Sequence, residues 1–116
     1  MGLVARGPEV TPTAYAITLE VAPDSEPEWL RWMRELHIPE VLREPGFLRC
    51  RLWKDASRAQ DGWVRYVAWY ELTGQEAVER YLGGEAVKRL RADGVARFGS
   101  AMRATRATLT EAASFG

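Results

Sequence analysis

The sequence predicts an α+β fold of the ferredoxin-like type, a β-α-β-β-α-β chain that forms an antiparallel sheet with both helices on one face. Two observations lead to this prediction. Four segments alternate between apolar and polar residues as strands do, and two longer segments repeat apolar residues every three or four positions as helices do. With 116 residues, 47% of them apolar, the chain is long enough for one domain with its own core.

The predicted domain covers residues 13–111. Residues 1–12 contain glycine, proline and isolated charges without any period, which predicts a flexible N-terminal arm, and residues 112–116 are predicted to form a C-terminal tail. We expect no signal peptide and no membrane span, because no apolar run is long enough. Cys50 is the only cysteine, which excludes an internal disulfide and indicates a reducing cytoplasm.

The charges of the chain give it no general attraction to polyanions. Lysine and arginine number 16, and aspartate and glutamate also number 16. Neither nucleic acid nor a membrane surface is therefore an expected partner. His37 is the only histidine, and the glycines form no phosphate-binding motif, so we expect no metal and no cofactor.

The first strand is predicted to begin at Thr13, where apolar residues alternate with small or polar ones. The apolar series is Tyr15, Ile17, Leu19 and Val21. Ser25 and Glu28 have the spacing of a capping box, which predicts the start of a helix. The predicted buried stripe of this helix consists of Trp29, Trp32, Met33, Leu36, His37 and Val41. Pro39 interrupts the stripe and predicts a kink or a short second helical segment.

The second and third strands are predicted to form a hairpin. Alternation in the second, residues 47–55, sets Leu48, Cys50 and Leu52 against Phe47, Arg49, Arg51 and Trp53. A polar loop ending in Asp61-Gly62 leads into the third, residues 63–72, which is rich in β-branched and aromatic residues.

The second half of the chain again predicts a helix followed by a strand. Thr73 and Glu76 form another capping-box pattern. The helix after them is expected to break at Gly83-Gly84 and to resume over Glu85–Phe98, before a last strand at residues 101–110. One face of the resulting sheet has no helix over it. Its aromatic residues would form an exposed apolar patch, so we predict a homodimer that buries this face.

Several short segments resemble the dimeric α/β-barrel superfamily. They are WLRWM at 29–33, HIPEVL at 37–42, GF at 46–47, ERYL at 79–82, RLR at 89–91 and ARFG at 96–99. The closer similarity is to a group of short bacterial proteins known only as a domain of unknown function and related to antibiotic-biosynthesis monooxygenases. The resemblance implies a dimer whose sheets face each other, with a mostly apolar pocket between the sheet and helices of each protomer. The superfamily also contains cyclases, isomerases, haem-degrading enzymes and stress-responsive proteins, so the activity stays open.

His37 is the first candidate for chemistry. It lies four residues after Met33 and four before Val41, so it should point from the apolar stripe toward the sheet or a pocket. Histidine suits proton transfer near neutral pH, and the resemblance implies a pocket position near this helix end, so His37 is a candidate catalytic base or acid. The alternatives are a hydrogen bond at the proline kink and simple exposure to solvent.

Arginine and tryptophan side chains on the strands are candidates for ligand binding. Arg49, Arg51 and Trp53 share one predicted face, where guanidinium and aromatic groups could hold a planar, anionic or phenolic ligand. Trp69 is a further candidate, although alternation alone does not tell which face it occupies. In the alternative interpretation, the arginines pair with glutamates within or across a dimer interface. Those glutamates are Glu20 and Glu71.

Tyrosines and two further arginines complete the candidates. Tyr66 is a candidate catalytic proton donor to a carbonyl or enolate oxygen, as are Tyr15 and Tyr70, with burial in the core as the alternative. Arg103 and Arg106 have opposite parity in the last strand, so only one of them can face a pocket.

These observations predict a cytoplasmic homodimer that binds a small apolar or aromatic metabolite. If the protein is an enzyme, cofactor-independent acid–base chemistry of the monooxygenase, cyclase or isomerase type on an aromatic or carbonyl-bearing substrate fits the candidates best. The alternative is a non-catalytic ligand sensor or structural dimer.

Overall fold

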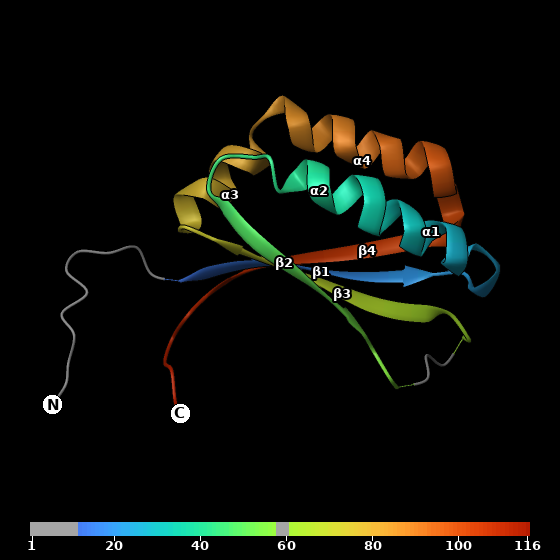
Figure 1. The fold of residues 1–116 in the computed structure, drawn as a ribbon, viewed down its shortest axis with the longest axis horizontal. Coiled ribbons are helices and arrows are strands. Elements are labelled where there is room, and N and C mark those ends of the chain that lie inside the picture. The colour runs from blue at the N-terminus through green and yellow to red at the C-terminus, as the bar shows by residue number, and fades with distance from the viewer. Residues whose placement is uncertain (1–11, 58–60) are drawn as a thin grey trace, which may run out of the picture.

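The protein forms a single four-stranded antiparallel sheet (Figure 1), in a computed structural model that describes residues 12–57 and 61–116. The strand order is β2-β3-β1-β4. The strands are β1 (Thr13–Val21), β2 (Phe47–Lys54), β3 (Val64–Leu72) and β4 (Met102–Thr110). This is the predicted α+β ferredoxin-like arrangement, and the fold class is confirmed. The predicted N-terminal arm lies, apart from Pro12, outside the described residues.

All the helices lie over one face of the sheet and leave the other face open (Figure 1). The first helical stretch consists of η1 (Pro23–Ser25), α1 (Glu26–Trp32), the π-helical turn η2 (Met33–His37) and α2 (Ile38–Val41). The second consists of α3 (Gln75–Leu82), α4 (Glu85–Phe98) and η3 (Gly99–Ala101). The core lies between these helices and the sheet, where Trp29, Met33, Tyr70 and Val78 are almost completely buried. Within the described residues, no helix combines the length and apolar character needed to cross a bilayer.

Strand pairing decides which side chains face the helices. Tyr15 of β1 pairs with Tyr70 of β3, and Ile17 pairs with Ala68, so these residues share the helix-covered face. Residues directly opposite one another in an antiparallel pair point to the same side. Arg51 of β2 pairs with Trp69 of β3, and both therefore point to the open face. The question that alternation left open for the third strand is settled in this way.

A β-bulge near the start of β2 separates Phe47 from Arg49, so the prediction that these two residues share one face of the strand is wrong. The pairing with β3 shifts between Phe47 and Arg49, so that Phe47 pairs with Leu72 and Arg49 pairs with Glu71. An extra residue in one strand reverses the side of every residue that follows it. Phe47 consequently packs in the core, on the side opposite Arg49, whereas Leu48 is 63% exposed.

Both predicted capping boxes are also absent. The chain enters α1 through the η1 turn, and Ser25 already has helical backbone angles, with φ −94° and ψ −10°. A capping side chain needs an extended N-cap residue to reach back to the helix, so Ser25 forms no such bond. At α3 the N-cap position is taken by Gly74, which has no side chain, and Thr73 lies one residue before it.

The two predicted interruptions of the helices are confirmed. The segment α2 is the short helix expected around Pro39, and the wide turn η2 precedes it. Proline lacks an N–H and crowds the preceding turn, and a π-helical turn accommodates such a break in the hydrogen-bond ladder. The helices α3 and α4 meet at Gly83 and Gly84, where the sequence placed the second interruption.

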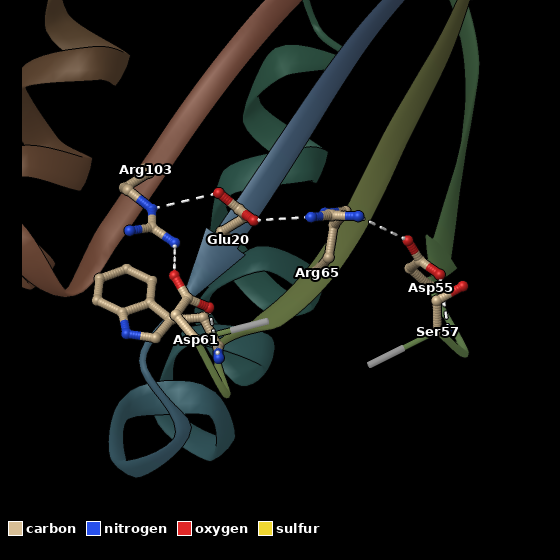
Figure 2. A network of polar contacts seen from close by, with 7 residues as sticks. Glu20, Asp55, Ser57, Asp61, Arg65 and Arg103 are labelled. Carbon is tan, nitrogen blue, oxygen red and sulfur yellow. Dashed lines mark hydrogen bonds and ion pairs between the residues drawn. The ribbon is translucent and has the colours of Figure 1, made fainter. Parts of the chain in front are cut away.

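Ion pairs cross the open face at one end of the sheet (Figure 2). Glu20 of β1 lies between two arginines, with oxygen–nitrogen distances of 3.1 Å to Arg65 and 3.2 Å to Arg103. Arg65 continues to Asp55, and Arg103 continues to Asp61. This chain of contacts ties the loop between β2 and β3 to the edge strand β4.

Candidate functional site

A cavity of about 340 Å³ lies between the helices and the covered face of the sheet. Residues from β1, β3 and β4 line its sheet side, and residues from both helical stretches line its helix side. Most of the lining is apolar, and its polar groups are one imidazole, three phenols and two guanidinium groups. These are His37, Tyr15, Tyr70, Tyr81, Arg91 and Arg106. A mainly apolar cavity with a few convergent polar groups is the common form of a small-molecule site.

His37 reaches this cavity from the last position of the π-helical turn. Its ring stacks on the indole of Trp32, with ring centroids 4.5 Å apart. The Nδ1 atom of His37 is buried and has no hydrogen-bond partner among the described residues. The imidazole therefore retains hydrogen-bonding capacity that its surroundings do not use.

Burial keeps the imidazole of His37 neutral. It lowers the pKa of His37 from 6.5 to about 4, with a smaller lowering from the positive charge of Arg106. The carboxylates of Glu40 and Asp93 oppose this shift but do not cancel it. A neutral imidazole at physiological pH is able to accept a proton.

Neighbouring side chains hold Trp32 in place beneath the histidine. Its indole Nε1 donates a hydrogen bond to the Asp93 carboxylate at 3.3 Å. The ring of Phe98 lies 5.3 Å from the Trp32 ring between centroids, and the Arg97 guanidinium lies over the indole. The position of His37 is thus fixed through an aromatic residue that α4 anchors.

Three tyrosines, two from the sheet and one from α3, cluster at one end of the cavity. The Tyr15 ring lies 6.5 Å from Tyr70 and 6.1 Å from Tyr81, measured between centroids. Burial raises the pKa of Tyr81 to about 12 and raises the pKa of Tyr70 further. The buried Tyr70 hydroxyl has no hydrogen-bond partner of ordinary geometry among the described residues, although the Cys50 thiol is a neighbour. Both phenols are therefore protonated and are potential hydrogen-bond donors.

Two arginines contribute the positive charge of the lining. Arg106 projects from β4 opposite Ile17, on the helix-covered side, whereas Arg103 belongs to the open face. Arg91 of α4 donates a hydrogen bond to the Tyr15 hydroxyl at 3.1 Å. Parity predicted that only one of Arg103 and Arg106 could face a pocket, and strand pairing identifies Arg106. Arg91 was not foreseen, because nothing in the helix pattern distinguishes it from other exposed arginines.

Tyr66 lies apart from His37. It is not among the residues that line the cavity, and its hydroxyl donates a hydrogen bond to the Glu26 carboxylate. Burial, together with this bond, raises the pKa of Tyr66. The structure therefore does not bring His37 and Tyr66, the two predicted catalytic residues, together in one cavity.

The four predicted ligand-binding residues lie on the open face, across the sheet from the cavity. They are Arg49, Arg51, Trp53 and Trp69. The Arg49 guanidinium forms an ion pair with Glu71 at 3.0 Å, as the alternative interpretation expected. A separate groove of about 610 Å³ on this side includes Trp69, Leu48 and Leu109. The predicted residues thus belong to a different surface from that of His37.

The Cys50 thiol is not activated as a nucleophile. Burial raises the pKa of the Cys50 thiol to about 11, so the reactive thiolate is scarce at neutral pH. Across residues 12–57 and 61–116, no group of three or more histidine, cysteine, aspartate or glutamate side chains is arranged to hold a metal ion.

Comparisons with solved structures reveal the same fold in proteins of low sequence identity. A proposed antibiotic biosynthesis monooxygenase from Nitrosomonas europaea is 16% identical with a TM-score of 0.61, over 93% of this chain and 97% of that one. SnoaB from Streptomyces nogalater, described as a cofactor-independent oxygenase, is 19% identical with a TM-score of 0.58, over 90% and 97%. An EthD family protein from Bacillus halodurans is 15% identical with a TM-score of 0.62, over 85% and 98%.

Sequence comparisons identify the family. No curated protein matches the chain significantly. A family model described as a domain of unknown function, DUF4286, matches residues 13–112, nearly the whole described domain. The relationship inferred from the short segments is confirmed, and the chain belongs to the DUF4286 family, with the fold of the antibiotic-biosynthesis-monooxygenase-like proteins.

Proposed function

We propose that the protein is a homodimer that binds a small, planar, largely apolar metabolite in the cavity and removes a proton from it with His37 as the base. The observation that carries this proposal is the neutral imidazole of His37, which lines an apolar cavity while its Nδ1 atom has no partner in the described chain. Buried polar atoms without partners are uncommon, and those at cavities are candidates for ligand contact.

The chemistry requires no cofactor. A phenol, enol or carbonyl-bearing ring loses a proton from its O–H or α C–H bond to an imidazole nitrogen of His37, and the electron pair moves onto the ligand oxygen. Burial in the apolar cavity is what lowers the pKa of His37 to about 4. A negative charge formed beside the imidazolium raises that pKa, so the base becomes stronger as the proton is transferred.

Tyr70 is the group best placed to stabilise the oxygen. Its buried hydroxyl lines the cavity without a hydrogen-bond partner of ordinary geometry, and its raised pKa keeps it protonated as a donor. We assign it the role for which the sequence had put forward Tyr66, since the Tyr66 hydroxyl is engaged by Glu26. The description of SnoaB, which has the same fold, as a cofactor-independent oxygenase supports such chemistry.

We further propose that the open face of the sheet forms the dimer interface, in a cytoplasmic protein. Leu48 is 63% exposed, Trp53 is 55% exposed and Leu109 is 41% exposed, which is unusual for so many large apolar side chains on one face. In this arrangement Arg49, Arg51, Trp53 and Trp69 serve the interface rather than the ligand.

Native mass spectrometry of the untagged protein tests both parts of the proposal. A dimer that carries additional mass is expected, and a stable monomer would contradict the interface. The His37→Phe variant keeps a ring stacked on Trp32 but removes both nitrogens, so it should remain dimeric while losing the retained mass. Arg31→Gln, an exposed change on α1, is the matched control and should retain it.

Proton abstraction has its own test. 2-Tetralone, a bicyclic ketone with acidic α C–H bonds, is incubated with the protein in D₂O, and its α-deuteration is followed by NMR. We expect the wild-type protein to accelerate exchange and His37→Phe to abolish the acceleration. Equal exchange with both proteins would rule out His37 as the base.

A non-catalytic ligand sensor is the second candidate, and the pKa of His37 favours it. An imidazole with a pKa of about 4 is a weak base, because the most effective bases have pKa values near the working pH. A sensor would bind 2-tetralone without accelerating its deuteration.

A further inference from the structure

The cavity has a positively charged mouth. Arg91 of α4 and Arg106 of β4 both line the cavity and are both exposed, so they lie where it meets solvent. No aspartate or glutamate is among the lining residues. Within the part of the chain that the structure describes, neither arginine has a carboxylate at ion-pair distance.

The opposite face of the same sheet shows a different arrangement. Arg49, Arg65 and Arg103 each have a carboxylate oxygen within 3.0 to 3.2 Å. Acidic residues on adjacent strands supply these partners, as Figure 2 shows for Arg65 and Arg103. At the cavity mouth the described chain supplies no carboxylate to Arg91 or Arg106. Both guanidinium groups are therefore available to an anionic ligand.

The two arginines act on the same region of the cavity. The Arg91 guanidinium is oriented by its hydrogen bond to the Tyr15 hydroxyl, which uses only part of its donor capacity. The positive charge of Arg106 lowers the pKa of both His37 and Tyr81, and the positive charge of Arg91 also lowers the pKa of Tyr81. An anionic group between the two arginines would therefore lie beside the tyrosines, with the apolar part of the cavity beyond it.

We infer that the ligand carries a carboxylate, which Arg91 and Arg106 hold at the mouth while its ring system occupies the apolar interior. This inference rests on the proposed function, because it specifies the ligand of the same cavity. Guanidinium groups bind carboxylates through paired, charge-assisted hydrogen bonds, and the aromatic lining provides the stacking surface for the ring. The ligand class is thus an aromatic or alicyclic monocarboxylic acid.

The inference is tested with two probes of nearly equal shape, 2-naphthoate and the neutral 2-naphthamide. Calorimetric titration should show that the acid binds at least about tenfold more tightly than the amide at low salt, the discrimination expected for a charge-assisted pair. Raising the salt concentration should weaken binding of the acid and leave the amide unaffected.

Variants locate the effect. Arg106→Gln and Arg91→Gln should each raise the Kd of 2-naphthoate about tenfold and leave the Kd of 2-naphthamide unchanged, because each removes one charge-assisted contact. Arg106→Lys, which keeps the charge, should recover part of the loss. Arg31→Gln is the matched control, and thermal unfolding of every variant checks that the fold is intact.

The possible failures are distinguishable. Equal binding of acid and amide, unchanged in the arginine variants, would overturn the carboxylate inference while the cavity remained a binding site. Tighter binding of the acid that persists in both arginine variants would place the anion elsewhere and overturn it as well. Binding of neither probe would count against the inference and the proposed function together.

Discussion

The imidazole of His37 lies on the indole of Trp32, with their planes inclined by only 25°. The tryptophan comes from α1 and is hydrogen-bonded to Asp93 of α4. The Trp32 ring therefore links the two helical stretches. The stack also screens the histidine from water, which contributes to the burial that keeps it neutral. The behaviour of His37 in acid consequently reports on this packing.

Acidification should destabilise the protein through His37. Its folded pKa, about 4, lies below the unfolded value of 6.5, so the unfolded chain binds the proton first as the pH falls. Stability is therefore lost between pH 6.5 and about 4, and the loss from this group reaches about 3 kcal/mol at the lower end. Urea unfolding of the wild type and of His37→Phe across this pH range measures this loss. If the free energy of unfolding of both proteins falls equally with pH, the lowered pKa of His37 is contradicted.

Substitution of Gly46 should be far more costly than that of Gly62. Both have positive φ, +87° and +79°, so alanine strains the backbone by about 1 kcal/mol at either position. A Cβ at Gly46 would in addition clash with the Ala77 Cβ, whereas no atom of the described residues lies within 4 Å of a Cβ at Gly62. We expect Gly46→Ala to cost about 2 kcal/mol more than Gly62→Ala, through overpacking of the turn before β2 against α3. Chemical denaturation of the pair gives the difference, and equal losses would exclude the close contact.

A charge on the open face should dissociate the proposed dimer. Leu48→Lys places a cation in the apolar surface of this face, and we expect a shift toward monomer in light scattering across a dilution series. Leu82→Lys changes a leucine of α3 that is 41% exposed, and it serves as the matched control. Dissociation by the control alone would move the interface to the helical side.

Two tyrosines of β3 should respond oppositely to loss of the hydroxyl. Tyr66→Phe removes the hydrogen bond to Glu26 and should lower the free energy of unfolding by about 1 kcal/mol. Tyr70→Phe removes a buried hydroxyl that has no hydrogen-bond partner of ordinary geometry, so stability should be unchanged or increased. The exchange assay with 2-tetralone should show the reverse order, with the larger loss in Tyr70→Phe. A larger loss in Tyr66→Phe would instead support the tyrosine that the sequence put forward.

Local patterns were sufficient to predict the elements of the fold. Alternation located β1 and β3 to within a residue, and Pro39 and the glycine pair marked the two breaks in the helices. The bulge at Leu48 was not predictable, because nothing in β2 itself indicates it. It depends on Phe47 pairing with Leu72 while Arg49 pairs with Glu71, and that alignment of two strands is a tertiary property.

The cavity was less predictable than the fold for a related reason. Its polar groups come from six elements, and only the helix spacing around His37 indicated a position facing inward. Arg91 and Arg106 are ordinary exposed arginines in the sequence, and their meeting at one opening depends on the packing of α4 against β4. The capping boxes failed for local reasons, because Ser25 already has helical backbone angles and because α3 begins one residue later than Thr73 would require, with Gly74 at its N-cap.

The π-helical turn η2 also constrains the length of the chain. Trp32 and His37 are five residues apart, whereas side chains that contact each other along an α-helix are three or four apart. The wider turn holds one residue more than a regular helix would need over the same rise. Deletion of a single residue from this turn would let the helix become regular and would leave the indole and the imidazole four positions apart, the spacing at which side chains along an α-helix meet. A family member shortened by one residue at this point would keep both the fold and the stacked pair, without a π-helical turn.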